Sequence, residues 1–92
     1  MIVGFRHKGL KRLYDDDDAR GLSAQDLRRI RLILSILDAA QTIEGMNVHT
    51  FRLHPLKGDL KGRWAVTVRA NWRIVFRFEN GKAYDVDLVD YH

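Results

Sequence analysis

The sequence contains no cysteine and a single proline, Pro55, among its 92 residues. Without cysteine the chain can form neither a disulfide nor a thiolate metal site, so the fold must depend on a hydrophobic core. No apolar run approaches the ~20 residues of a membrane-spanning helix, and the first residues lack the apolar stretch of a signal peptide. We therefore expect one soluble, cytoplasmic domain, residues 1–92, with no membrane partner.

Acidic side chains are scarce in one part of the chain. Between His49 and Phe78 seven lysines and arginines stand against one acidic residue, Asp59, whereas the first 48 residues are nearly balanced. Positive charge concentrated on one part of a small domain favours a polyanionic partner such as nucleic acid. The alternative is that solvated arginines only keep a small domain soluble.

Residues 62–78, GRWAVTVRANWRIVFRF, alternate as in two half-buried strands joined by a tight turn at Ala70-Asn71. Side chains of a strand alternate between the two faces of a sheet. One face of this predicted hairpin is apolar and carries Trp64, Val66, Val68, Trp72, Ile74, Phe76 and Phe78. The other face is predicted to carry four arginines, which are Arg63, Arg69, Arg73 and Arg77.

The remaining elements are predicted from periodicity and turn residues. Short strands are expected at Met1–Arg6 and at Val48–His54, and Pro55 ends the second. A last strand is expected after the Asn80-Gly81 turn. Its core-facing residues would be Tyr84, Val86 and Leu88. Helices are expected at Lys8–Tyr14 and, with Ser23 as N-cap, at Ser23–Leu37; a further turn at Asp38–Glu44 ends at Gly45. The predicted fold class is α/β (α+β), with two N-terminal helices packed on one face of a mostly antiparallel sheet of four to five strands.

Four consecutive aspartates, Asp15 to Asp18, interrupt the helical pattern. Adjacent carboxylates repel one another and favour a solvated loop. A metal site is the alternative, although consecutive side chains point in different directions and have no convergent partners.

The residue types needed for acid–base chemistry lie at two ends of predicted strands: His54, and the group Asp90, Tyr91 and His92. Two imidazoles, a phenol and a carboxylate can transfer protons near neutral pH, and arginines hold phosphate and stabilise its developing charge. Such a set can cleave RNA without a metal.

Two other interpretations of these residues remain open. His54 could only hydrogen-bond within the sheet while residues 90–92 fray, or His54, Asp90 and His92 could bind a metal, which the nearby arginines would oppose. His7 and His49 are interpreted as surface residues.

Several segments resemble one family of toxins. The LHPLKG segment at Leu53–Gly58, the TVRANWRI segment at Thr67–Ile74 and the terminal Asp-Tyr-His are similar to HigB-type toxins of the RelE superfamily, also called plasmid maintenance system killer proteins. The segments Phe5–Leu10 and Ser23–Asp26 extend the resemblance over nearly the whole chain.

The resemblance implies a RelE-like domain that acts as the toxin of a type II toxin–antitoxin system. The implied activity is that of a ribosome-dependent endoribonuclease, which cleaves mRNA in the A site and stops translation without a metal or other cofactor. Its catalytic residues would be His54, Asp90, Tyr91 and His92. Phosphate would be bound by Lys57 and Arg73, and the basic face would add Arg52, Arg63, Arg69 and Arg77.

The implied partners are a HigA-type helix-turn-helix antitoxin, the ribosome with its rRNA, and mRNA; operator DNA is reached only through the antitoxin. The alternative is a non-enzymatic toxin that binds DNA gyrase, as related ParE-type proteins do. That alternative leaves His54 and the terminal Asp-Tyr-His without a role.

Overall fold

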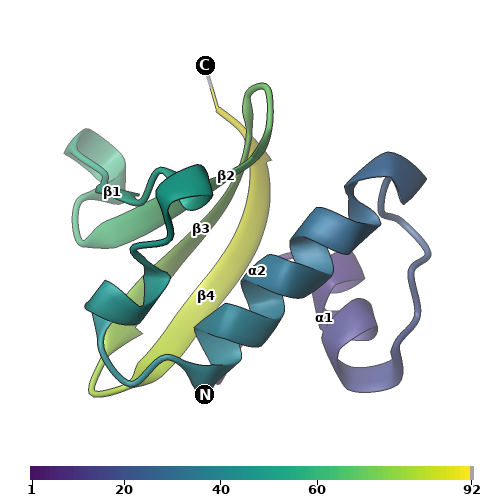
Figure 1. Cartoon of the computed structure of the whole chain (residues 1–92), viewed down its shortest axis with the longest axis horizontal. Coiled ribbons are helices and arrows are strands. Elements are labelled where there is room, and N and C mark those ends of the chain that lie inside the picture. The colour runs from purple at the N-terminus through teal and green to yellow at the C-terminus, as the bar shows by residue number, and fades with distance from the viewer. Residues whose placement is uncertain (92) are drawn as a thin grey trace.

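The computed structural model describes residues 1–91 and shows two helices on one side of a single antiparallel sheet (Figure 1). The helices are α1 (Lys8–Asp16) and α2 (Leu27–Ala39), and the sheet order is β1 (His54–Pro55), β2 (Arg63–Arg69), β3 (Trp72–Glu79) and β4 (Lys82–Asp90). Short 3₁₀ turns cover Ala24–Asp26, Ile43–Met46, His49–Phe51 and Gly58–Leu60. The predicted α+β architecture is confirmed. Within residues 1–91, neither helix has the length and apolar character needed to cross a membrane.

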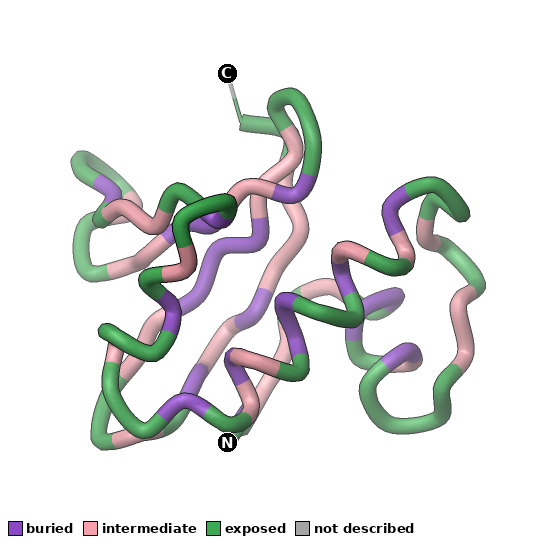
Figure 2. The backbone as a smooth tube through the Cα atoms, in the orientation of Figure 1, coloured by how far each residue is buried: buried purple, intermediate pink, exposed green. Residues whose placement is uncertain are grey.

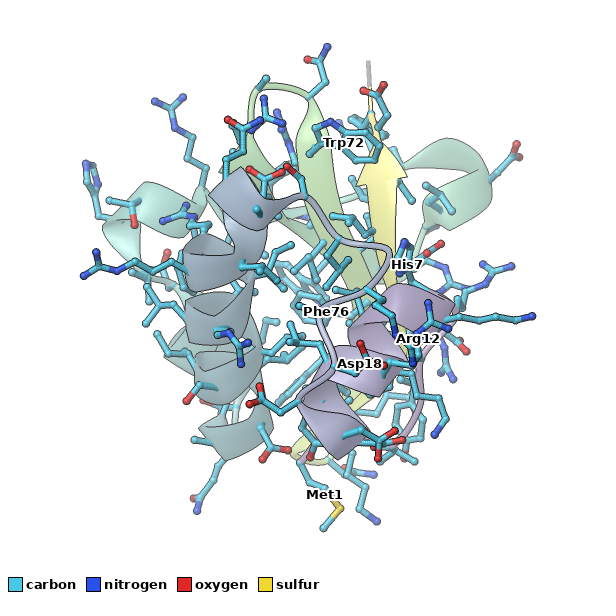
Figure 3. The ribbon with its side chains drawn as sticks, turned by 90° about the vertical axis from the view of Figure 1, so that its right-hand side faces the viewer. Met1, His7, Arg12, Asp18, Trp72 and Phe76 are labelled. Atoms are coloured by element: carbon cyan, nitrogen blue, oxygen red, sulfur yellow. The ribbon has the colours of Figure 1, made fainter. Side chains whose placement is uncertain are left out.

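The main core lies between the helices and the sheet, where buried segments of both face each other (Figure 2). The apolar stripe of α2 packs on the apolar side of the hairpin, as predicted, and Phe76 lies between the two helices (Figure 3). The fully or nearly fully buried members include Leu10, Ile30, Ile33, Leu37, Val66, Ile74, Phe76 and Val86. Spacing of three and four residues along α2 therefore places its branched side chains over the strands.

The N-terminal segment contributes less to the sheet than predicted. Residues 2–5 make only two isolated parallel bridges to β4, Ile2 to Ala83 and Phe5 to Val86. Just after it, the His7 side chain accepts a hydrogen bond of 3.1 Å from the backbone N–H of Leu10 and caps α1. His7 is therefore a structural residue of the helix start rather than a free surface histidine.

The predicted cap of the second helix is wrong. Ser23 makes no side-chain capping bond, and a 3₁₀ turn at Ala24–Asp26 precedes α2. The α-helix then continues to Ala39, two residues beyond its predicted end, and Gly45 lies inside the next 3₁₀ turn rather than ending a helix.

The predicted strand at Val48–His54 is also wrong for most of its length. His49–Phe51 forms a 3₁₀ turn that buries Phe51, and strand pairing is confined to His54 opposite Ala65 and Pro55 opposite Trp64. Apolar residues at alternate positions suggested a strand, but here the chain turns, with Arg52 in the left-handed region at φ 52°.

Both two-residue turns of the sheet are confirmed, at Ala70-Asn71 and Asn80-Gly81. Asn80 and Gly81 have φ values of 51° and 76°, as expected for the turn residues that match strand twist. Two bulges change which side chains lie on each face of the sheet. The register shift between Thr67 and Arg69 places Arg69 opposite Trp72, on the helix-covered face, and a shift at Val75/Arg77 pairs Tyr84 with Arg77 on the other face.

The predictions that Arg69 faces outward and that Tyr84 belongs to the core are therefore wrong. Ala83 takes the buried position next to Val86.

The four aspartates form the predicted solvated loop only in part: Asp15, Asp16 and Asp17 are exposed, but the first two belong to a helix. Asp15 and Asp16 end α1, and Asp17 caps it with φ 55°. Ion pairs join Lys11 to Asp15, Arg31 to Asp17 and Arg20 to Asp18, and the hydrogen bonds from Arg20 lower the pKa of Asp18 to about 2. Three of the four carboxylates thus bind three different cations, which explains how adjacent aspartates are tolerated.

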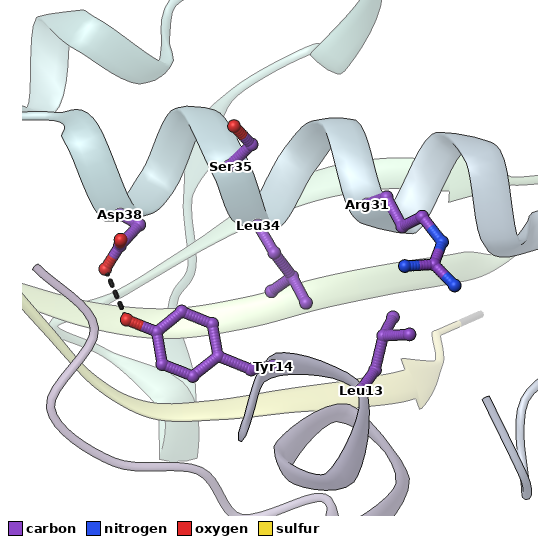
Figure 4. Close-up of a pocket in the computed structure, with 6 residues that line it drawn as sticks. All are labelled: Leu13, Tyr14, Arg31, Leu34, Ser35 and Asp38. Atoms are coloured by element: carbon purple, nitrogen blue, oxygen red, sulfur yellow. Dashed lines mark hydrogen bonds between the residues drawn. The ribbon is translucent and has the colours of Figure 1, made fainter. Parts of the chain in front are cut away.

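A hydrogen bond joins the two helices across a pocket lined by Leu13, Tyr14, Arg31, Leu34, Ser35 and Asp38 (Figure 4). The Tyr14 hydroxyl donates to Asp38 Oδ1 at 2.7 Å, and the backbone N–H of Ile2 donates to the same oxygen at 2.9 Å. These bonds lower the pKa of Asp38, and the bond to the carboxylate raises the pKa of Tyr14 to about 12.

We expect Tyr14→Phe to lower the free energy of unfolding by about 1 kcal/mol at pH 7, because the lost charge-assisted hydrogen bond is partly exposed. Because folding lowers the pKa of Asp38, its carboxylate stabilises the folded state fully above the unfolded pKa of about 4. This stabilisation is lost as the pH falls through the folded pKa. Because folding raises the pKa of Tyr14 to about 12, its neutral hydroxyl stabilises the folded state below pH 10, and this stabilisation is lost between pH 10 and about 12. Urea unfolding across pH should show the difference shrinking at both extremes, and a difference constant with pH would contradict this explanation.

Candidate active site

The outer face is the side of the sheet opposite the helices, and its centre is apolar. Leu56 and Leu60, from the segment between β1 and β2, pack on Ala65, Val75 and Val89 and form a second small core. The register places Arg63, Thr67, Arg73 and Arg77 on this same face. The outer face is thus an apolar centre bordered by basic side chains, rather than a uniformly basic surface.

His54 lies on the outer face at one edge of the sheet, because it pairs with Ala65 across β1 and β2. Its Nδ1 lies 2.9 Å from the carbonyl oxygen of Arg52. A carbonyl oxygen only accepts, so the neutral ring carries its proton on Nδ1 and keeps a lone pair on Nε2. A lone pair on Nε2 is what a general base acting through that atom requires, and the ring can act as an acid there once Nε2 has taken up a proton.

The carbonyl of Arg52 points to His54 because Arg52 itself is left-handed, with φ 52° and ψ 48°. The sequence predicted Arg52 only as an RNA contact, and its backbone role was missed. No local signal could have revealed it, since this conformation is uncommon for a residue other than glycine.

Asp90 and Tyr91 lie at the end of β4, beside the turn between β2 and β3 (Figure 1). The backbone N–H of Tyr91 donates to the Asn71 carbonyl at 2.8 Å, and the side chain is 41% exposed. Arg73 is fixed to the same turn, since its Nη1 donates to the Ala70 carbonyl at 2.5 Å. His92 lies outside the described residues.

His54 and Asp90 therefore lie on opposite edge strands, with β2 and β3 between them. At about 4.8 Å for each strand spacing, the two edges are on the order of 14 Å apart. Arg73 lies on the third strand, between them. Asp90 pairs with Trp72 and so belongs to the helix-covered face, whereas His54 and Arg73 lie on the outer face. The sheet therefore brings Arg73 onto the face of His54 but does not bring Asp90 there.

Two of the predicted phosphate-binding arginines are paired with acidic side chains. Arg77 Nε lies 2.9 Å and Arg63 Nη1 3.5 Å from Asp85 Oδ2, and Arg77 also pairs with Glu79 and stacks on the Tyr84 ring. The hydrogen bond from Arg77 lowers the pKa of Asp85. These pairs neutralise much of the positive charge at this end of the outer face.

Arg69 is held on the helix side. Its Nε donates to Asp26 Oδ1 at 2.7 Å, and Asp26 is a buried charged residue with 7% exposure. This pair supplies a partner for a carboxylate that would be costly to bury alone. It also fixes the β2–β3 turn to the start of α2.

The remaining predicted cations are differently placed. Arg52 and Lys57 are exposed, and no salt bridge to Arg52, Lys57 or Arg73 occurs within residues 1–91. Their positive charge is therefore available to a polyanion. No group of three His, Cys, Asp or Glu side chains in the described part of the chain is arranged to hold a metal ion.

The sequence and the fold were compared with those of known proteins. Residues 3–92 match the family model of HigB-like toxins, described as the RelE-like toxin of the type II toxin–antitoxin system HigB. The chain belongs to this family. The resemblance seen in its motifs is thereby confirmed over residues 3–92.

Two relatives of this HigB-like toxin have names that describe their activity. It is 50% identical over 92 residues, covering both chains completely, to "Endoribonuclease HigB" of Proteus vulgaris. It is 30% identical over 90 residues to "Toxin HigB-1" of Vibrio cholerae, covering 96% of this chain and 95% of the relative.

Among solved structures, the fold is similar to that of YafQ from Escherichia coli BL21(DE3), with a TM-score of 0.58 and 14% identity over 98% of this chain and 91% of that one. A mutant form of YafQ from Escherichia coli aligns with a TM-score of 0.56, 15% identity and the same coverage. At this identity the similarity concerns the fold alone.

Proposed function

We propose that this HigB-like toxin is an endoribonuclease that cleaves mRNA in the ribosomal A site by metal-independent acid–base chemistry and so inhibits translation. The observation that carries the proposal is His54, whose ring is oriented by the Arg52 carbonyl on the outer face, with Nε2 left to exchange a proton. The half-identical, full-length relative named as an endoribonuclease supports this class of enzyme.

The reaction assigns each group a role. A base takes the proton of an RNA 2′-hydroxyl, whose oxygen attacks the adjacent phosphorus, and an acid protonates the leaving 5′-oxygen to give a cyclic phosphate and a free 5′-hydroxyl. His54 and His92 share the base and acid roles, Asp90 orients an imidazole, and Tyr91 positions the base or the phosphate. Arg73 and Lys57 bind the phosphate and stabilise its added negative charge.

As the toxin of a type II system, the protein has an antitoxin partner. The finer proposal is a HigA-type antitoxin with a helix-turn-helix, through which alone the complex reaches operator DNA. The ribosome and mRNA are the other proposed partners, and the proposed location is the cytoplasm. The exposed cations Arg52 and Lys57 support contact with RNA.

Primer extension on a reporter mRNA in a purified translation system tests the proposal. We expect cuts at discrete in-frame positions, only with ribosomes, and none after deletion of His92. Cleavage without ribosomes would indicate a free ribonuclease. Intact mRNA together with inhibited DNA gyrase would favour the ParE-like alternative.

A further inference from the structure

The side chain of Arg29, on the first turn of α2, reaches two backbone segments that adjoin His54. Arg29 Nη2 donates to the Thr50 carbonyl at 2.6 Å and to the Thr67 carbonyl at 2.9 Å, and Nε is 3.2 Å from the same Thr67 oxygen. Nη1 lies 3.1 Å from Thr50 Oγ1. The guanidinium also stacks over the ring of Phe51, with its carbon 5.0 Å from the centroid.

Each of these contacts lies close to His54 along the chain or across the sheet. Thr50 and Phe51 immediately precede Arg52, whose carbonyl binds His54 Nδ1. Thr67 is on β2, two residues from Ala65, the residue with which His54 pairs. Thr67 also begins the bulge of β2. One guanidinium therefore connects the segment that orients the His54 ring to the strand that supports it.

The position of His54 needs such a connection because β1 is only two residues long. Two paired residues at a sheet edge hold the backbone weakly. The left-handed conformation of Arg52 also has a cost, which the surrounding structure must offset. A planar guanidinium with several donors can hold two carbonyls at once, whereas an ammonium is a single point of charge.

We propose that Arg29 is a positioning residue for the reaction: it fixes Thr50–Arg52 to β2 and so keeps the Arg52 carbonyl in place to hold His54 with Nε2 directed for proton transfer. This inference rests on the catalytic role proposed above for His54. Arg29 does not contact RNA in this role, and its effect on cleavage passes entirely through the ring orientation of His54.

Arg28, the adjacent residue on α2, provides a matched control. It is exposed and carries the same charge, and its side chain makes no hydrogen bond or ion pair within residues 1–91. The variants Arg29→Ala and Arg28→Ala each remove one positive charge. Any loss caused by weaker general attraction to RNA is therefore common to both variants.

The test measures mRNA cleavage in the purified translation system together with the His54 ring tautomer by ¹⁵N NMR. We expect Arg29→Ala to lower kcat about 10- to 100-fold with little change in KM, since a misplaced catalytic group mainly affects the chemical step. Arg29→Lys should recover only part of the rate. The wild-type ring should be the Nδ1–H tautomer, and both Arg29 variants should show a mixture, while Arg28→Ala matches the wild type in both measurements.

Cleavage by Arg29→Ala at the rate of Arg28→Ala would overturn the proposal, as would an unchanged His54 tautomer in Arg29→Lys. A rate that falls only in proportion to the folded fraction, measured by thermal unfolding, would also overturn it. If the wild-type toxin fails to cleave with ribosomes, the proposed function fails instead. The tautomer comparison then still decides whether Arg29 orients the ring.

Discussion

Replacing His54 with alanine should lower the rate of mRNA cleavage by about 10²- to 10⁴-fold, which is the usual contribution of a general acid or base. The physical reason is that Nε2 is the proton-exchanging atom left by the Nδ1 contact to the Arg52 carbonyl. The fold should survive, since His54 lies on a two-residue edge strand outside the main core. Single-turnover cleavage on ribosomes measures the rate, and circular dichroism measures the folded fraction.

His49→Ala is the matched control for this prediction. His49 is a second histidine five residues earlier, exposed and in the 3₁₀ turn before β1. Its replacement should leave cleavage near the wild-type rate. Equal losses in the two variants, or full activity without His54, would contradict the role assigned to this ring.

The second large effect is expected at Arg73. Arg73→Ala should lower the cleavage rate by about 10²- to 10³-fold, as loss of a charge that stabilises the transition state does elsewhere. Arg73 is fixed to the Ala70 carbonyl beside the end of β4, so its charge is held where the scissile phosphate is proposed to lie. The measurement is the same single-turnover assay, with binding to ribosomes recorded separately.

Arg77→Ala separates this effect from general basic charge. Arg77 lies on the same strand and the same face, but Asp85 and Glu79 already neutralise it. We expect it to change cleavage far less than Arg73→Ala. If the two variants lose the same activity, the outer face acts through its total charge and not through one positioned guanidinium.

The hairpin of β2 and β3 was predictable because its signals are local: alternation over 17 residues and a two-residue turn. The bulges that move Arg69 inward and Tyr84 outward were not, because each is one extra residue inserted against a partner strand that lies elsewhere in the chain. The 3₁₀ turn at His49–Phe51 was missed for a similar reason, since burial of Phe51 by distant side chains outweighs the strand-like pattern.

In the candidate site, too, the residue types could be predicted from the sequence, whereas their surroundings could not. The chemistry of His54 and of Asp90, Tyr91 and His92 is evident from their identities. The availability of each arginine depends on partners distant in sequence, such as Asp26 for Arg69. The orientation of His54 depends on Arg52, only two residues away, but through a backbone conformation that residue type does not specify.

The two edges of the sheet bear on self-association. β1 is two residues long and contains Pro55, which cannot donate to a neighbouring strand. On the other edge, the N-terminal segment bridges β4 at Ala83 and Val86. A second copy of the chain therefore finds no long open strand, within residues 1–91, on which to add its own. The short edge strand that carries His54 therefore also limits the backbone that a toxin without its antitoxin offers to another copy for strand addition.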